Sequence, residues 1–222
     1  MSGLTDRAVE VYQLRIWIRR ISPQIWRRLL VRSDSTITQL HDTLQIAFGW
    51  MDEHLNQFLI RGKPYGVWQP GGMGFDANPH HVQLRDFHFR SKETFVYEYD
   101  LTDWWQHEIR LEQILPLDPK KLYPICTAGK RRGPIEDCGG PWAFMELQDN
   151  YPLWEVLPQF AQFLLDHQDN LDDYQDELRR QAYWVVRENF DRQAVNRRLA
   201  EYATRLREEE GSSHAYPGTD AH

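Results

Sequence analysis

The densest group of chemically active side chains lies between residues 97 and 108, in the string YEYDLTDWWQHE. Asp100 and Asp103 flank a turn in this string, and His107 follows shortly after. An imidazole beside carboxylates can ligate a transition metal, or can act as a general base whose pKa the carboxylates raise. The same residues also fit a structural role, in which His107 is a hydrogen-bonded core histidine and the aspartates bond the turn amides.

A second histidine, His54, stands beside two carboxylates in the string DEHL. Two imidazoles with carboxylates form a set compatible with a metal site, and the candidate ligands are His54, Asp103 and His107. The spacing alone does not show that the two segments meet, so we predict no cofactor.

The string CTAGKRRGPIEDCGG, residues 126–140, is the second candidate region. Its basic cluster of Lys130, Arg131 and Arg132 lies among glycines, whose backbone amides could form an anion site. The spacing matches neither the GxxxxGK[ST] loop nor the GxGxxG loop, so this anion site is only weakly indicated. The alternative is a structured turn that closes against the sheet.

Glu136 and Asp137 in the same string are further candidates for acid–base chemistry. Together, the candidate catalytic residues are His54, Asp100, Asp103, His107, Glu136 and Asp137. No GxSxG, HExxH or kinase motif occurs, so nucleophilic catalysis has no support. The two cysteines, Cys126 and Cys138, come without a second CxxC or an HxxxH, so no zinc site made by cysteines is predicted.

Length and composition limit the organisation of the chain. The 222 residues are 41% hydrophobic, which suffices for one packed domain. We expect this domain over residues 9–206, an N-terminal extension over residues 1–8 and a disordered tail over residues 208–222. No apolar run approaches the length of a membrane span, and the start lacks a signal peptide, so we expect a cytoplasmic protein without a membrane partner.

The charge pattern argues against a general nucleic-acid coat, because the formal net charge is −7. Residues 1–50 nevertheless hold seven arginines against four acidic residues. These arginines are either solvated faces of strands or a local surface for an anion such as DNA.

The elements that must position these residues follow from hydrophobic periodicity. Alternation predicts strands over 12–18 and 25–31 and a hairpin of 95–99 with 105–111, with His107 on the inward face beside Trp105. A helix is predicted over 37–48, with a capping box at Thr36 and Gln39 and a stop at Gly49. The sequence predicts an extended segment over 55–60, a long loop over 62–81, irregular structure over 116–150, and about three helices after Pro152, the last capped by Asp191. The expected fold is α+β, an antiparallel sheet packed with an N-terminal helix and this C-terminal set of helices.

Four motifs, in this order, resemble the Ri-plasmid open-reading-frame-three-like family. They are IWRR at 25–28, LHD through AFGW to HLNQF over 40–58, YxYDxxDxWxHxI over 97–109, and PxEDCGG over 134–140. The resemblance runs from about residue 9 to about residue 206. It implies a compact α+β domain from bacteria or archaea, often encoded near mobile elements, and some members carry the label of an insertion-element passenger or resolvase-type protein. No serine in this chain lies in a recombinase signature.

The chain departs from the family pattern at two positions. Thr102 replaces a common glycine in the hairpin turn, which matters if that position needs a positive φ, and Ile135 replaces a proline before Glu136.

Three functions stay open. The first is a binding or accessory module of a plasmid or mobile genetic element, with a protein or a nucleic acid as partner. The second is a metal-assisted hydrolase that uses the His/carboxylate candidates. The third is a DNA-binding accessory factor that uses the N-terminal arginines.

Overall fold

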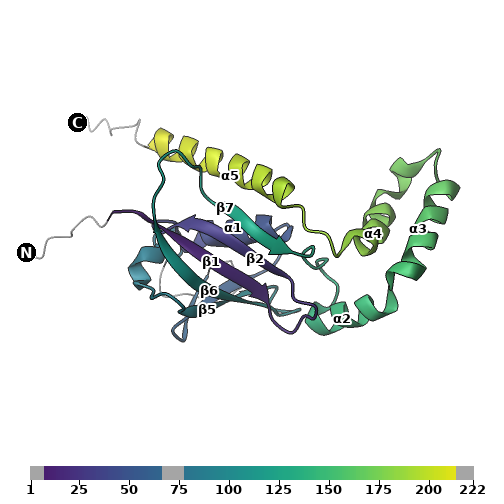
Figure 1. Ribbon diagram of the computed structural model, residues 1–222, viewed down its shortest axis with the longest axis horizontal. Coiled ribbons are helices and arrows are strands. Elements are labelled where there is room, and N and C mark those ends of the chain that lie inside the picture. The colour runs from purple at the N-terminus through teal and green to yellow at the C-terminus, as the bar shows by residue number, and fades with distance from the viewer. Residues whose placement is uncertain (1–7, 67–77, 214–222) are drawn as a thin grey trace, which may run out of the picture.

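The fold is built on one antiparallel sheet (Figure 1). The computed structural model describes residues 8–66 and 78–213. Seven strands pair in the order β4-β3-β5-β6-β1-β2-β7. Their bounds are β1 Glu10–Ile18, β2 Trp26–Arg32, β3 Asn56–Ile60, β4 Lys63–Tyr65, β5 Thr94–Tyr99, β6 Trp105–Pro116 and β7 Ile125–Lys130. The predicted α+β class and antiparallel sheet are confirmed.

Alternating burial along the central strands confirms the predicted inward face. In β1 the side chains of Leu14 and Ile16 are buried, and Ile16 pairs with Ile109 of β6. The predicted hairpin forms between β5 and β6, and Trp105 and His107 both face the core. Apolar burial on one sheet face is what fixes this register, because a shift by one residue would expose the whole set.

Helix α1, Ile37–Phe48, forms as the sequence predicts. The capping box is complete, since the Gln39 amide donates to Thr36 Oγ1 and the Thr36 amide donates to Gln39 Oε1. Gly49 ends the helix with a φ of 85°. The apolar side chains of α1 join the same core as the sheet.

The prediction of irregular structure over 116–150 is wrong, because this segment contains strand β7 and helix α2, Gly140–Asn150. Strand β7 pairs with β2 at the sheet edge, and of its side chains only Cys126 is fully buried, so it shows no apolar alternation. The pairing partner, which is distant in sequence, makes this strand.

The remaining helices are α3 Leu153–Asp166, α4 Gln175–Val186 and α5 Arg192–Ser213, with short 3₁₀ turns at Leu84–Phe87 and Leu171–Tyr174. Asp191 caps α5, as predicted, by accepting a hydrogen bond from the Ala194 amide. Helix α5 runs past residue 208 to Ser213, further than the sequence suggests. Residues 1–7 of the expected N-terminal extension, 67–77 of the expected loop and 214–222 of the expected tail lie outside the described residues.

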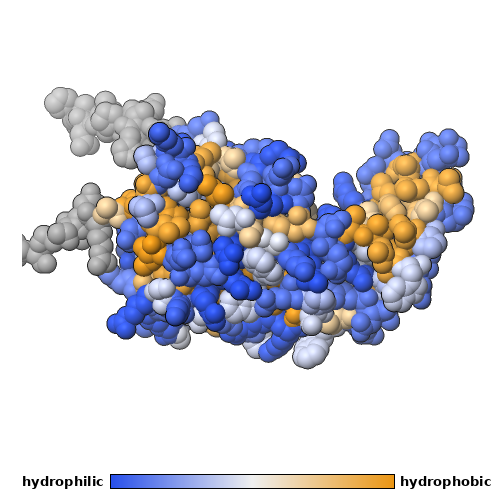
Figure 2. Space-filling model, in the orientation of Figure 1, coloured by the Kyte–Doolittle hydropathy of each residue, from blue (hydrophilic) through white to orange (hydrophobic). Residues whose placement is uncertain are grey.

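Helices α3 and α4 form an arm that projects from the sheet body, whereas α5 returns along β7 and α1 (Figure 1). Helix α3 exposes Leu153, Leu157 and Leu165, and Figure 2 shows hydrophobic surface along the arm. No helix within the described ranges combines the length and apolarity needed to cross a membrane.

Arg27 of β2 is a large charged side chain in the core, with an exposed fraction of only 1%. Its Nε donates to the Ala47 carbonyl at the end of α1, and its Nη1 donates to the carbonyls of Trp26 and Lys130. The guanidinium carbon lies 3.9 Å from the Phe190 ring centroid. Burial lowers the pKa of Arg27 to about 10, so the side chain stays charged at neutral pH.

Replacing Arg27 should therefore destabilise the fold strongly. We expect Arg27→Met to lower the free energy of unfolding by about 3 kcal/mol, because it leaves buried carbonyls without donors. Arg28→Met is the matched control, because Arg28 faces the other side of the same strand in a partly exposed pair with Glu112 and should lose about 1 kcal/mol. Urea unfolding measures both, and an equal loss in the two variants would contradict the role of Arg27.

His107 lies fully buried on the inner face, among the rings of Phe48, Trp50 and Tyr97. Neither ring nitrogen makes a hydrogen bond within the described residues. Burial lowers the pKa of His107 from 6.5 to about 3. The imidazole is therefore a neutral core group at neutral pH.

A depressed pKa in the folded state makes stability depend on pH. The unfolded chain takes up a proton near pH 6.5 and the folded chain does not, so stability is complete above that pH and falls as the pH drops toward 3. Between about pH 7 and pH 5, protonation of this histidine in the unfolded chain should lower the free energy of unfolding by about 2 kcal/mol. We expect His107→Gln to show a correspondingly flatter dependence in urea unfolding at several pH values, and the same slope in both proteins would refute the assignment.

Candidate functional site

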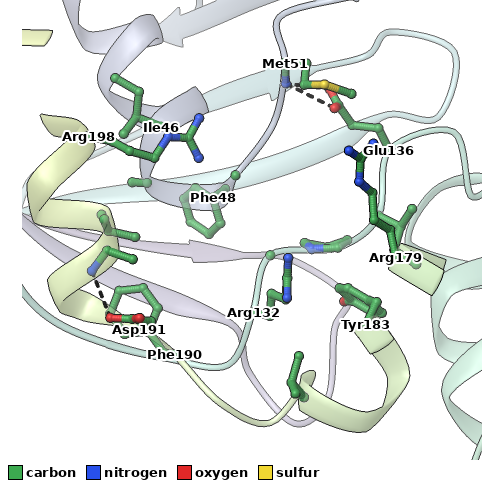
Figure 3. A pocket seen from close by; sticks show the side chains of 18 of the residues that line it. Ile46, Phe48, Met51, Arg132, Glu136, Arg179, Tyr183, Phe190, Asp191 and Arg198 are labelled. Carbon is green, nitrogen blue, oxygen red and sulfur yellow. Dashed lines mark hydrogen bonds between the residues drawn. The ribbon is translucent and has the colours of Figure 1, made fainter. Parts of the chain in front are cut away.

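A cleft of about 730 Å³ lies where the projecting arm joins the sheet body (Figure 3). Its walls come from the end of α1, the loop that follows β7, helix α4 and the start of α5. The end of α1, the loop after β7 and the α4–α5 region are far apart in the sequence, so the cleft exists only in the folded chain.

The loop after β7 is held directly against the end of α1. A Cβ atom at Gly133 would overlap the Phe48 carbonyl oxygen, so only glycine permits this approach. The indole of Trp50 donates to the Pro134 carbonyl at 2.9 Å. A Cβ atom at Gly129 of β7 would likewise overlap the Phe190 ring. Because glycine has no Cβ atom, Phe190 can pack here and reach Arg27.

Aromatic and aliphatic side chains make the floor of the cleft, among them Phe48, Tyr183, Phe190 and Val195. Tyr183 is buried, and burial keeps its phenol protonated by raising its pKa. Such a surface accepts the apolar part of a ligand, because burying it releases water from both partners.

Arginines from three different elements surround this floor. Arg132 comes from the loop after β7, Arg179 from α4 and Arg198 from α5, and Figure 3 shows the three side chains around the cavity. Arg179 pairs with Asp176 at 3.5 Å. Arg132 and Arg198 are exposed and form no ion pair with any described residue, although the Arg132 guanidinium lies 5.7 Å from the Tyr183 ring.

An acidic group beside the cleft centres on His54, and two of its members, Glu53 and Asp137, line the cleft. The His54 Nε2 atom lies 3.0 Å from Asp137 Oδ1, and its Nδ1 lies 3.9 Å from Asp100 Oδ2. Glu53 brings a further carboxylate, and ligand atoms of Glu53, His54 and Asp137 all lie within 4.8 Å of one another. The structure thus brings together three of the predicted candidates, His54, Asp100 and Asp137, with Glu53 as an unpredicted neighbour.

Glu136 lies next to this group and has partners of its own. Its carboxylate accepts a hydrogen bond from the Tyr99 hydroxyl at 2.6 Å and from the Met51 amide at 3.1 Å. Burial and the Glu136 carboxylate raise the pKa of Tyr99, so the phenol remains a donor. Glu136 therefore links the loop after β7 to β5 and to the end of α1.

The two aspartates of the hairpin turn have structural partners. Asp100 Oδ1 accepts from the amides of Thr102 and Asp103, which closes the turn. Asp103 Oδ2 accepts from the Gly139 amide at 3.0 Å, and a Cβ atom at Gly140 would overlap the Asp103 carbonyl oxygen. Positive φ occurs at Asp100 and not at Thr102, so the absence of glycine at position 102 has no conformational consequence.

His107, the other predicted metal and catalytic candidate, lies in the aromatic core and not with His54. Its ring packs against Phe48 and Trp50, with no exposed surface. Alternation in the sequence predicts that His107 faces inward, and its complete burial makes it a core residue that a ligand cannot reach.

The predicted basic cluster at 130–132 does not converge on one site. Lys130 ends β7 opposite Trp26, and Arg131 pairs with Glu188 at 2.8 Å. Only Arg132 reaches the cleft. The two cysteines are free thiols, and burial raises the pKa of Cys126 and, to about 12, that of Cys138.

Most N-terminal arginines that the structure describes have internal partners. Arg19, Arg28 and Arg32 form ion pairs with Glu108, Glu112 and Asp34. Arg27 is buried. The local positive charge of this segment is therefore largely compensated, which weakens the DNA-binding alternative.

Sequence reasoning missed Glu53, Arg179, Arg198, Tyr183 and Phe190. The spacing of Arg179 and Tyr183 places them on one face of α4, but charged residues on a helix face are common without any site. The sequence contains no signal that selects these arginines.

A further group of polar side chains lies on α1. His41 contacts the Tyr97 hydroxyl and the Asp52 carboxylate at 2.7 Å each, and Asp42 accepts from the Tyr202 hydroxyl. Both imidazole nitrogens therefore have partners, and the group ties α1 to the sheet and to α5.

The chain is similar to proteins that are known by family and by structure. Residues 10–198 match the family described as plasmid pRiA4b ORF-3-like protein. A Sinorhizobium fredii protein, described as uncharacterized protein y4hQ, is 30% identical over 140 residues, which are 61% of this chain and 70% of that protein. The crystal structure of MM3350 from Methanosarcina mazei Go1, a protein of unknown function, superposes with a TM-score of 0.62 and 31% identity, covering 84% of this chain and 97% of that chain. The family match spans most of the chain, in agreement with the motifs and the sheet, and the chain belongs to the plasmid pRiA4b ORF-3-like family.

Proposed function

We propose that the protein is a binding module whose cleft takes an anionic ligand with an apolar or aromatic body. One observation carries this proposal: Arg132 and Arg198 project over an apolar floor without an ion-pair partner among the described residues. A guanidinium binds carboxylate and phosphate groups by paired, charge-assisted hydrogen bonds.

The dimensions and the floor of the cleft support the same ligand class. A volume of about 730 Å³ matches the sites that proteins use for small molecules. The rings of Phe48, Tyr183 and Phe190 would cover the apolar part of such a ligand, and the arginines would hold its charge at one end. An acidic peptide segment with an aromatic side chain has the same chemistry.

The family description names a plasmid open reading frame, and we propose an accessory role for the module in that setting. In this proposal the module responds to an anionic partner and performs no chemistry on it. A second candidate, a metal-assisted hydrolase, is favoured by the group around His54, of which Glu53 and Asp137 line the same cleft.

The proposal is tested with 8-anilinonaphthalene-1-sulfonate, a fluorescent probe that carries one anionic group on an aromatic body. We expect the wild-type protein to bind one equivalent, and the double variant Arg132→Gln/Arg198→Gln to bind at least about 10-fold more weakly, since each charge-assisted hydrogen bond contributes about 1.5 kcal/mol or more. Fluorescence titration measures both affinities.

Arg61→Gln is the matched control, because Arg61 is an exposed arginine that pairs with Glu93 and does not line the cleft. Its affinity for the probe should equal that of the wild type, and thermal melting should show that every variant is folded. Equal affinity of the double variant and the wild type would overturn the proposal.

A further inference from the structure

The group around His54 combines the donor atoms of a transition-metal site. It offers one imidazole nitrogen from His54 and carboxylate oxygens from Glu53 and Asp137, all within 4.8 Å of one another. Metal bonds of about 2.1 Å place tetrahedral ligand atoms roughly 3.4 Å apart. Because Glu53 and Asp137 are exposed, a shift of about 1 Å in their side chains would close this geometry.

The His54 ring has a nitrogen whose bonding capacity is not fully used. Its Nε2 atom is shielded from solvent and makes no aligned hydrogen bond within the described residues, although Asp137 Oδ1 lies 3.0 Å away. A shielded nitrogen without a partner costs free energy, and a metal ion bound to its lone pair would remove that cost.

A carboxylate and an aromatic ring lie on the other sides of the His54 imidazole. On the far side of the ring, the Asp100 carboxylate, with a side-chain exposure of 5%, lies 3.9 Å from Nδ1. The Tyr99 ring packs edge to face against the imidazole at 5.7 Å. At 3.9 Å the Asp100 carboxylate makes no hydrogen bond to Nδ1, but its negative charge favours a proton on that nitrogen, which would leave Nε2 free to bind the metal.

The neighbouring groups do not compete for the ion. Glu136 is held by the Tyr99 hydroxyl and the Met51 amide. In the His41 group both imidazole nitrogens already have partners, so it offers no free nitrogen. Of the two candidate ligand groups found among the described residues, the His54 group is the one that combines a free imidazole nitrogen with exposed carboxylates.

From this geometry we propose that Glu53, His54 and Asp137 bind one divalent first-row transition-metal ion at the edge of the cleft. The imidazole favours such an ion over Mg²⁺ and Ca²⁺, which prefer oxygen ligands alone. Three protein ligands leave at least one coordination position open toward the cleft, where Glu53 and Asp137 form part of the lining. This site does not depend on which ligand the arginines bind.

The test uses the full-length protein, stripped with a chelator and titrated separately with Zn²⁺ and Mn²⁺ by calorimetry. We expect one equivalent of metal to bind, and we expect His54→Asn and Asp137→Asn each to weaken binding by more than about 100-fold. This loss exceeds the roughly 10- to 100-fold loss that is typical when a group behind a ligand is changed. Asp100→Asn keeps the oxygen that closes the turn and removes the charge behind His54, so it should weaken binding by about 10- to 100-fold.

Asp52→Asn is the matched control, because Asp52 belongs to the His41 group and should leave affinity unchanged. Metal should also raise the melting temperature of the wild type and not that of Asp137→Asn. Because the Asp137 side chain is exposed, we expect this variant to fold normally. The proposal is overturned if the wild type binds neither metal, if Asp137→Asn binds as the wild type does, or if only Asp52→Asn loses binding.

Discussion

The buried guanidinium of Arg27 is the constraint on which the rest of the structure depends. It donates hydrogen bonds to backbone carbonyl groups in the last turn of α1, in the edge strand β7 and in its own strand. The ring of Phe190, which lies just before α5, packs against it. A charge without a carboxylate partner is tolerated here because several carbonyl oxygens and two aromatic rings surround it. Two of the segments that it joins, the end of α1 and the residues just before α5, border the cleft, so Arg27 contributes both to the stability of the fold and to the position of the site.

Polar residues that look catalytic in the sequence divide into two groups. Asp103 and the first oxygen of Asp100 close the hairpin turn and hold the segment that leads into α2, while His107 fills the aromatic core. His54 has a shielded ring nitrogen without an aligned hydrogen bond, and Asp137 has an exposed carboxylate at the edge of the cleft. The two groups differ in how far their hydrogen-bonding positions are already occupied. A carboxylate whose oxygens accept backbone hydrogen bonds has few acceptor positions left for a ligand.

The lining of the cleft carries charges of both signs. Arg132 and Arg198 contribute guanidinium groups, and Glu53 and Asp137 contribute carboxylates, around an apolar floor. A molecule with an anionic group and an apolar body, or one bridged to a bound cation, would match these groups. Both signs meet because the arm, the loop after β7, the start of α5 and the end of α1 contribute different side chains to one space.

The sequence by itself determined the elements whose signals are local. Alternation in β1 and in the hairpin, the capping box of α1 and the cap at Asp191 could all be predicted, because one-sided burial and end-capping act over a few residues. Tertiary structure decided the rest. Strand β7 exists because β2 pairs with it, and Arg198 faces the cleft because α5 folds back over β7. The same helical arginine would be an ordinary solvated charge elsewhere, since what surrounds a side chain depends on segments distant in sequence.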